Sequence, residues 1–526
     1  MPSKWIATAA LLVLTLLAVP ASTAPRGGYT TDVSGGGSGD LPFTALTTKF
    51  ISPTGNDGNA GTSGSPWASP NHAMNCGDVI IAAAGTYSTE WTSWGTVSNC
   101  PSTSGGIDGT GGIYTATVLC AGPDLTSCPH TGMRVNASHW AVEGFKVSKT
   151  TGDGFCLLAD ASATSSTRYG YIAFINDIAT NCLTGFATAD GGHPSGSPGN
   201  GVDEWAVMGS IAQNANQEGL CIGAIDDAGP ANFDSFVGTH VYYGGNFAIN
   251  NQAPSCTGLA DVEGLFWDTF DAHGYTGKSV MENNISYNNG GIGFAVFMQS
   301  TVSSTLSMTF NHNTSFHNLA CLQAATAGAV FGDQNFNLTG GFPWTISVQN
   351  SLLQGDLATV GCGSGGWIYG LQVGGTVGST VFSSSGNLIR GITGACHLGP
   401  VCDAGNNERA GDGYSLGSDS YGTASFTNTT DLLANWIGAP NCTGKADVAS
   451  CMGWNNGSQT ATSLTPIADL VATAGAAAGK GYQPPGPCAA NSLYPTWTKG
   501  IVYLQWNSGS STITEKAGLV NKPCSM

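Results

Sequence analysis

Positive charge is scarce in this chain, and the shortage excludes two classes of partner. Lys and Arg together number 15 against 33 Asp and Glu, which gives a formal net charge of −18 over 526 residues. A nucleic-acid binder needs a basic stripe that displaces counterions, and a peripheral membrane protein needs one that attracts anionic lipids. We therefore expect no nucleic-acid partner and no membrane partner.

Metal-type cysteine spacing and long apolar runs are also absent. The 16 cysteines include no CxxC pair and no Cys/His cluster, so a zinc site is not expected. An even cysteine number spread along the chain instead fits disulfides formed in an oxidising compartment. No apolar run after the first two dozen residues is long enough to span a bilayer.

The N-terminus has the composition of a secretory signal peptide. Lys4 precedes an apolar run from Trp5 to Val19, and small residues follow up to Ala24. Pro25 disfavours a cut directly after Ala24, so cleavage after Ala21 is favoured. We expect a secreted, extracellular protein whose residues 1–24 are not part of the fold.

What the chain does have is a short phrase that recurs with a period of roughly 30 to 37 residues. Each copy has a small residue or Asn, then alternating apolar and polar residues, with no helical pattern. The copies are Gly144-Phe145-Lys146-Val147, Asp177-Ile178-Ala179-Thr180, Ser210-Ile211-Ala212-Gln213, His240-Val241-Tyr242-Tyr243, Asn284-Ile285-Ser286-Tyr287, Asn313-Thr314-Ser315-Phe316, Asn350-Ser351-Leu352-Leu353 and Asn387-Leu388-Ile389-Arg390.

A second short strand follows most copies, for example Gly154-Phe155-Cys156-Leu157 and Gly293-Phe294-Ala295-Val296. Strands of three to five residues separated by Gly or Asn turns describe the coils of a parallel β-helix. Asn at the same turn of successive coils can stack as a ladder that satisfies buried backbone groups. We therefore interpret most of these asparagines as scaffold.

The period divides the chain into five segments. Residues 1–24 are the signal peptide, 25–45 a Gly/Ser-rich leader and 46–395 the β-helix, with a short capping helix expected near Ser69 to Asn75. Residues 396–487 read as loop-rich C-terminal coils with a cap around Asp431 to Trp436. Residues 488–526 read as a small β appendage.

The segment from residue 50 to 87 resembles the N-terminal cap of secreted right-handed parallel β-helix enzymes of the pectate-lyase-like superfamily. The resemblance is carried by Ser52-Pro53-Thr54-Gly55-Asn56-Asp57, Gly61-Thr62, Pro66-Trp67, Gly77-Asp78-Val79-Ile80 and Gly85-Thr86-Tyr87, and later by residues 282–291. It implies an all-β, single-stranded right-handed parallel β-helix with a carbohydrate context. Lyases, hydrolases and non-catalytic adhesins share that scaffold, so the reaction stays open.

One coil is expected to be oversized, because Val241 to Ile285 is 44 residues against 29 to 33 for its neighbours. The extra length holds an acidic concentration in a chain that is only 9% charged. An enlarged coil would build a groove wall, so we predict the site here. The candidates are Lys278, Asp268 and Glu263 as catalytic residues, Trp267, His273, Tyr275 and Tyr243 as substrate-binding residues, and Asp261, Asp268 and Asp271 as metal ligands.

Two chemistries fit these residues. As the resemblance implies, carboxylates would hold Ca²⁺ on a uronate polymer while Lys278 removes the C5 proton in a β-elimination. Alternatively, two carboxylates among Asp261, Glu263 and Asp268 would flank a glycosidic bond in a hydrolase. A non-catalytic glycan-binding role is the third hypothesis, and Asp203-Glu204 and Asp226-Asp227 are the alternative places for a groove. We expect a monomer that acts on a polysaccharide.

Overall fold

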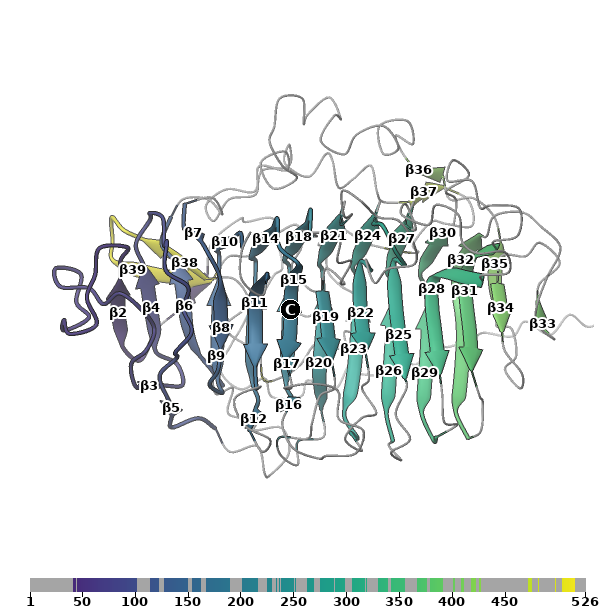
Figure 1. The fold of residues 1–526 in the computed structure, drawn as a ribbon, viewed down its shortest axis with the longest axis horizontal. Coiled ribbons are helices and arrows are strands. Elements are labelled where there is room, and N and C mark those ends of the chain that lie inside the picture. The colour runs from purple at the N-terminus through teal and green to yellow at the C-terminus, as the bar shows by residue number, and fades with distance from the viewer. Residues whose placement is uncertain are drawn as a thin grey trace, which may run out of the picture.

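The chain winds into a solenoid of three parallel sheets, which we name sheets A, B and C (Figure 1). The computed structural model describes residues 45–101, 114–122, 127–149, 154–161, 167–189, 201–215, 238–249, 263–268, 275–287, 289–298, 305–316, 330–338, 342–354, 367–375, 379–390 and 504–515, with isolated residues and short strands between and beyond them. These residues include no α-helix, and thus no helix long and apolar enough to cross a membrane.

Sheet A runs the length of the solenoid, each strand pairing in parallel with the strand one coil later. Its strands are β2 (Thr48–Ile51), β4 (Val79–Ala82), β6 (Ala116–Cys120), β9 (Trp140–Glu143), β13 (Ile172–Ile175), β17 (Trp205–Met208), β20 (Thr239–Gly244), β23 (Lys278–Glu282), β26 (Ser307–Asn311), β29 (Thr345–Gln349), β32 (Val381–Arg390) and β35 (Ser418–Tyr421).

Sheet B follows sheet A in the coils from β6 to β29, and the two sheets join where the long strand β32 pairs with both β29 and β30. Its other strands also pair in parallel. They are β7 (Pro129–His130), β10 (Lys146–Val147), β14 (Ile178–Thr180), β18 (Ile211–Gln213), β21 (Phe247–Ile249), β24 (Ile285–Tyr287), β27 (Thr314–Phe316) and β30 (Leu352–Gln354).

Sheet C completes each coil and is parallel except at its last pair. Its strands are β8 (Met133–Val135), β11 (Phe155–Asp160), β15 (Thr184–Ala189), β19 (Ile225–Ala228), β22 (Leu265–Asp268), β25 (Phe294–Met298), β28 (Val330–Leu338), β31 (Trp367–Gly375) and β34 (Glu408–Ala410), with β33 (Val401–Cys402) antiparallel to β34. The succession A, B, C confirms the predicted parallel β-helix.

The interior is filled by rows of apolar side chains that repeat at one strand position per coil. In sheet A one such row pairs Val142, Phe174, Val207, Tyr243, Met281, Phe310 and Val348 in register, and all are fully buried. Each large buried side chain stabilises the fold by about 1.5–3 kcal/mol relative to its exposed state. The alternate residues Ala141, Ala173 and Ala206 belong to a separate cluster with Trp497, so successive residues of sheet A point to opposite faces.

The corner between sheets A and B is the most regular part of the molecule. At each turn one residue has a left-handed backbone, with φ between 50° and 84°: Gly144, Asn176, Gly209, Gly245, Asn283, His312, Asn350 and Gly386. Gly and Asn tolerate this conformation better than other residues do. The requirement explains the Gly or Asn at most of these turn positions, which in most copies of the phrase directly precede its first residue.

The next residue of each A–B turn forms the predicted ladder. The side-chain oxygens of Asp177, Ser210, Asn246, Asn284, Asn313, Ser351 and Asn387 accept in succession from the backbone N–H of the preceding coil, over 2.8–3.2 Å. A shorter ladder of Asn251, Asn289 and Asn318 lies between sheets B and C. The scaffold interpretation of these asparagines is confirmed.

The ladder also corrects the expectation of an oversized coil. Asn246, not His240, is the ladder partner of Asn284, and the step between them is 38 residues. The step from Asn313 to Ser351 is also 38 residues, so the coil is not exceptional. His240-Val241-Tyr242-Tyr243 belongs to sheet A, one strand earlier than the other copies. Both strands are short, apolar and Gly-flanked, so the pattern alone does not distinguish them.

The capping helix predicted near Ser69 to Asn75 is not formed. These residues make bends that lead into strand β3 (Met74–Asn75), which pairs with β5 (Val97–Ser98). The Asp57 carboxylate accepts from the backbone N–H of both Ala68 and Ser69 over 2.9 Å, and Pro70 disfavours a helical conformation at the residue before it. The other cap, around Asp431 to Trp436, lies outside the described residues.

A three-stranded antiparallel sheet joins both ends of the chain. Strand β1 (Leu41–Phe43), from the segment predicted to be leader, pairs with β39 (Thr512–Glu515), which pairs with β38 (Leu504–Asn507). Leu504 and Ile513 pack on Val79, Ile81 and Leu119 of sheet A. In Figure 1 this yellow hairpin lies beside the first purple strands. The outer face of sheet A is therefore covered in the first coils.

Disulfides and short strand pairs complete the described structure. Three disulfides join Cys76 to Cys100, Cys120 to Cys128 and Cys156 to Cys182, consistent with an oxidising compartment. The remaining pairs are β12 (Arg168–Tyr169) with β16 (Gly201–Val202) and β36 (Ser425–Phe426) with β37 (Ala472–Ala474).

Candidate active site and metal centre at the corner between sheets C and A

Two of the predicted residues lie on either side of one corner, between sheets C and A. Asp268 ends β22, Lys278 begins β23, and the side chain of Lys278 is exposed. The chain between them includes Asp271 and His273, and both lie outside the described residues, as does Asp261. The corner therefore brings one acidic and one basic position close along the chain, with Lys278 facing solvent.

Glu263 lies at the other end of β22. It precedes Leu265 and is buried, whereas Asp268 is the last residue of the strand. The extended part, Leu265 to Asp268, alone spans roughly 10 Å at about 3.3 Å per residue. Glu263 is therefore not placed next to Asp268 and Lys278.

The predicted sugar-stacking aromatics are interior residues. Trp267 and Tyr243 are fully buried, with ring centroids 5.6 Å apart, and Trp267 also lies 5.2 Å from Phe310 of the next coil. Such tilted aromatic pairs stabilise a core beyond their buried area. Both rings pack between coils, so the stacking role expected for them has no solvent-facing surface on which to act.

Tyr275, the third predicted aromatic residue, is hydrogen-bonded to a buried polar cluster. Its hydroxyl donates to Asp203 Oδ1 over 2.8 Å, although the two residues are 72 positions apart. Asp203 Oδ1 also lies 2.9 Å from His240 Nδ1, and Glu204 Oε1 lies 3.3 Å from the same nitrogen. Asp203, Glu204 and His240 are all buried. The pair named as an alternative groove thus belongs to an inward-facing cluster, which we call the Asp203 cluster.

Contacts from outside the Asp203 cluster fix its members. His240 Nε2 lies 2.8 Å from the carbonyl oxygen of Phe236, which can only accept, so this nitrogen carries a proton. The backbone N–H of Phe233 donates to Asp203 Oδ2 over 2.9 Å. His240 Nδ1 is consequently the atom that decides the state of the cluster: protonated, it donates to Asp203, and deprotonated, it offers a lone pair.

The donor set of the Asp203 cluster fits a cation. One ligand atom each from Asp203, Glu204 and His240 lie within 4.8 Å of one another. A metal-binding histidine usually donates its other N–H to a carbonyl or carboxylate, and Phe236 provides that acceptor. Two carboxylates with an imidazole suit Mn²⁺, Fe²⁺ or Zn²⁺ better than Ca²⁺, which prefers six to eight oxygens. A second gathering, Cys76, Cys100 and His139, has its sulfurs bonded to each other.

The sequence predicts Asp203-Glu204 only as an alternative place for a groove, and His240 as part of the scaffold. The adjacent acids before an apolar strand were the available signal. Nothing local links them to His240, 37 residues later, or to Tyr275. The cluster exists because the three coils stack in register.

Comparison with known proteins yields fold-level likeness. No family model matches the chain, and no curated protein matches it. Among solved structures, pectate lyase Pel9A is 13% identical, with a TM-score of 0.32 over 69% of this chain and 84% of its own.

Two further solved structures are similar to the chain at lower identity. A mannuronic acid specific polysaccharide family 6 lyase from human gut microbiota is 9% identical, with a TM-score of 0.25 over 72% of this chain and 83% of that one. The GH136 lacto-N-biosidase from Eubacterium ramulus is 9% identical, with a TM-score of 0.26 over 71% and 68%. At TM-scores this low, neither the role of a residue nor the reaction of these proteins can be inferred for this chain. By its own strand pairing the chain has the parallel β-helix fold.

Proposed function

We propose that the chain is a secreted carbohydrate-active enzyme that cleaves a polysaccharide at the corner between sheets C and A. The observation that carries the proposal is the exposed Lys278 at the start of β23, the strand that follows β22 and its last residue, Asp268, along the chain. The signal-like N-terminus and three disulfides support export. The outer face of sheet A is less suited to a glycan, because Trp497, Leu504 and Ile513 pack on it.

The chemistry that fits best is β-elimination on a uronate-containing polymer. Lys278 would take the C5 proton, the C4–C5 bond would become double, the C4–O bond to the leaving sugar would break, and the leaving oxygen would take a proton from water. Ca²⁺ bound by Asp261, Asp268 and Asp271 would supply the charge that acidifies the C5 proton and offsets the repulsion between a polyanion and a chain of net charge −18. We assign calcium to these carboxylates, not to the Asp203 cluster.

Hydrolysis by Glu263 and Asp268 is the less favoured reaction. A hydrolase pair flanks the bond at about 5–9.5 Å, and the four-residue strand β22 alone separates the backbones of Glu263 and Asp268 by roughly 10 Å. The burial of Glu263 also keeps it from an extended substrate. A glycoside hydrolase on this scaffold would therefore need another pair of carboxylates.

The test is a polysaccharide panel followed by ultraviolet absorbance of unsaturated uronates and by reducing-end formation, with and without a chelator. We expect chelator-sensitive absorbance that Lys278→Ala and Asp268→Asn abolish while the melting temperature stays within a few degrees. Lys146→Ala, a partly exposed lysine of sheet B, is the matched control and should keep full activity. Reducing ends without the absorbance would replace elimination by hydrolysis. Retention on a polysaccharide gel without any new ends would reject catalysis.

A further inference from the structure

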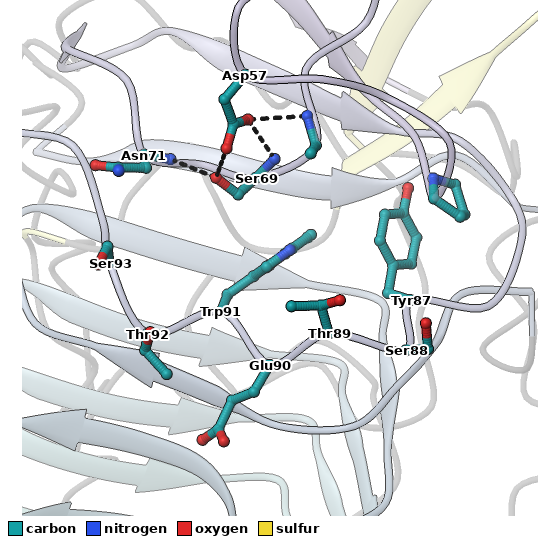
Figure 2. Close-up of a pocket in the computed structure, with 12 residues that line it drawn as sticks. Asp57, Ser69, Asn71, Tyr87, Ser88, Thr89, Glu90, Trp91, Thr92 and Ser93 are labelled. Atoms are coloured by element: carbon teal, nitrogen blue, oxygen red, sulfur yellow. Dashed lines mark hydrogen bonds between the residues drawn. The ribbon is translucent and has the colours of Figure 1, made fainter.

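A pocket at the N-terminal end of the solenoid is separate from the corner described above. It has a volume of about 320 Å³ and is lined by three loops, around Pro53 to Asp57, Ala68 to Asn71 and Tyr87 to Ser93. Figure 2 shows the Asp57–Ser69 pair on one side and Trp91, Thr89 and Thr92 on the other. The volume lies at the small end of the range for small-molecule sites, ~300–1,000 Å³.

The floor of the pocket is made of closely packed aromatic rings. Trp91 bridges to Met133 in parallel, and its ring lies 4.3 Å from that of His130 and 5.3 Å from that of Tyr87. The Tyr87 hydroxyl donates to the Ala83 carbonyl over 2.9 Å, and burial raises its pKa well above the usual value. These rings form a packed, uncharged floor that does not need a ligand to hold it.

The charged groups of the pocket are compensated by the protein. Glu90 Oε1 accepts from Lys149 Nζ over 2.7 Å. Asp57 accepts from the backbone N–H groups of Ala68 and Ser69 and from the Ser69 hydroxyl. Burial is the largest influence and raises the pKa of Asp57, but hydrogen bonds from Ser69, Ala68 and His72 together leave it lowered. Asp57 is therefore ionised and held, and it still presents acceptor lone pairs.

Among the described residues that line the pocket, none is a lysine, an arginine or a histidine that could pair with an anionic ligand. Lys149 is engaged with Glu90 and is largely buried. Burial lowers the pKa of His130 to about 3, so the ring behind Trp91 is neutral. An added carboxylate or phosphate would face Asp57 and Glu90 without a counter-charge, which disfavours both.

Uncommitted hydroxyls complete the lining. Ser88, Thr89, Thr92 and Ser93 are exposed, and their side chains make no hydrogen bond to any residue that the structure describes. Asn71 adds an exposed amide. Such groups can donate and accept, as the hydroxyls of a polyol do. The pocket is therefore small, has a packed aromatic floor, pairs its own charged groups and exposes hydroxyls. These features suit a small, uncharged ligand that carries several hydroxyl groups.

We propose that this pocket binds a neutral sugar unit, as a glycan-anchoring site distinct from the corner where cleavage is proposed. The ligand would be a chain end or side branch without a carboxylate, hydrogen-bonded by Thr89, Asn71 and the Asp57 carboxylate. A polymer held here and reached by the corner would carry both neutral and acidic sugars. The anchoring site itself does not depend on the cleavage reaction.

The test uses the full chain and the methyl glycosides of glucose, galactose, mannose and glucuronic acid, followed by saturation-transfer NMR and titration calorimetry. We expect at least one neutral glycoside to bind and the glucuronide to bind about tenfold more weakly or not at all. Ser93→Trp, which fills the pocket from an exposed position, should abolish binding, and Thr89→Val should weaken it. The controls Ser63→Trp and Thr96→Val change exposed residues outside the pocket and should bind normally.

Three outcomes would overturn the proposal: no neutral glycoside binds, Ser93→Trp binds as well as the wild type, or the glucuronide binds equally well. The Lys278→Ala variant must keep the binding, since it changes only the corner between sheets C and A. Its loss of cleavage with retained binding separates the two sites, and the converse holds for Ser93→Trp. A failure of the cleavage assay therefore leaves the binding result decisive for the pocket.

Discussion

The chain turns at both corners that flank sheet A, but the residues that form the two turns differ. At the A–B corner successive coils repeat one left-handed residue and one ladder residue, from Asn176-Asp177 to Gly386-Asn387. At the C–A corner three early coils also use left-handed residues, His139, Tyr171 and Glu204, but their side chains differ in kind. Repetition marks scaffold, whereas individual side chains mark a place where chemistry can arise.

The largest effect should come from the individual corner. We expect Asp203→Ala to cost about 3–5 kcal/mol in the free energy of unfolding, because it leaves a buried histidine and tyrosine without their common acceptor. Urea denaturation measures the loss. Asp160→Ala removes a partly exposed ion pair with Arg134 and should cost about 1 kcal/mol or less. Equal losses for the two variants would mean that the Asp203 cluster is not a structural hub.

The repeated corner should be next. Asn284→Ala removes the acceptor of the Asn246 N–H and the donors to Tyr243 and Asn313, so we expect a loss of about 2–4 kcal/mol. The matched control Asn350→Gly keeps the left-handed turn at φ 50° and should change stability by about 1 kcal/mol or less. Thermal unfolding of both variants shows whether the ladder residue or the left-handed turn residue contributes more to the stability of the corner.

One ladder residue, Asp177, is a carboxylic acid where the others are Asn or Ser, so we expect the stability of the fold to depend on pH through it. Burial raises the pKa of Asp177 well above 3.8, although backbone hydrogen bonds from Phe145, Ile175 and Gly144 oppose the shift. The native state then keeps a proton that the unfolded chain releases, so this residue lowers stability as pH rises through and above about 4.

We expect Asp177→Asn to stabilise the fold by about 1 kcal/mol at pH 7 and to flatten the slope of stability against pH above 4. The Asp177 Oδ2 atom has no hydrogen-bond partner among the described residues, and an amide there can donate as it does at Asn246 and Asn284. Urea midpoints between pH 4 and 8 measure the slope. An unchanged slope would assign the pH dependence to other carboxyl groups.

The smallest effect sharpens the same comparison within the Asp203 cluster. Tyr275→Phe removes one donor to Asp203 while the Phe233 N–H and His240 remain, so the loss should be about 0.5–1.5 kcal/mol. Differential scanning calorimetry can resolve it. A loss as large as that of Asp203→Ala would make Tyr275, not the carboxylate, the centre of the cluster.

The recurring phrase was enough to predict the coil, its strands and its ladder, because these depend on contacts between equivalent residues of neighbouring coils. It failed where two strands of one coil looked alike. His240-Val241 and Asn246-Phe247 both fit the phrase, and taking the first suggested a coil of 44 residues where the ladder measures 38. Coil length therefore no longer predicts a groove here, and what remains is the placement of Asp268 and Lys278 at one corner.

The candidate site residues, too, were predictable from the sequence only in part. Their chemical types were visible in the sequence, but their exposure was not: Lys278 faces solvent, whereas Trp267 and Tyr243 lie in the core. A residue at a given strand position points inward or outward only once the register of the strand is known. The pocket near Asp57 was invisible for a related reason, since its three loops meet only after the first coils have formed.

By itself, the sequence determined that this protein is a solenoid with Asn-laddered corners, since a periodic chain can bury its apolar rows only by stacking on itself. Only the tertiary structure decided which strand belongs to which sheet, how the C-terminal hairpin covers sheet A, and that Asp203, His240 and Tyr275 meet in one buried cluster. Those outcomes depend on contacts between residues that share no local pattern, and such contacts are fixed by packing alone.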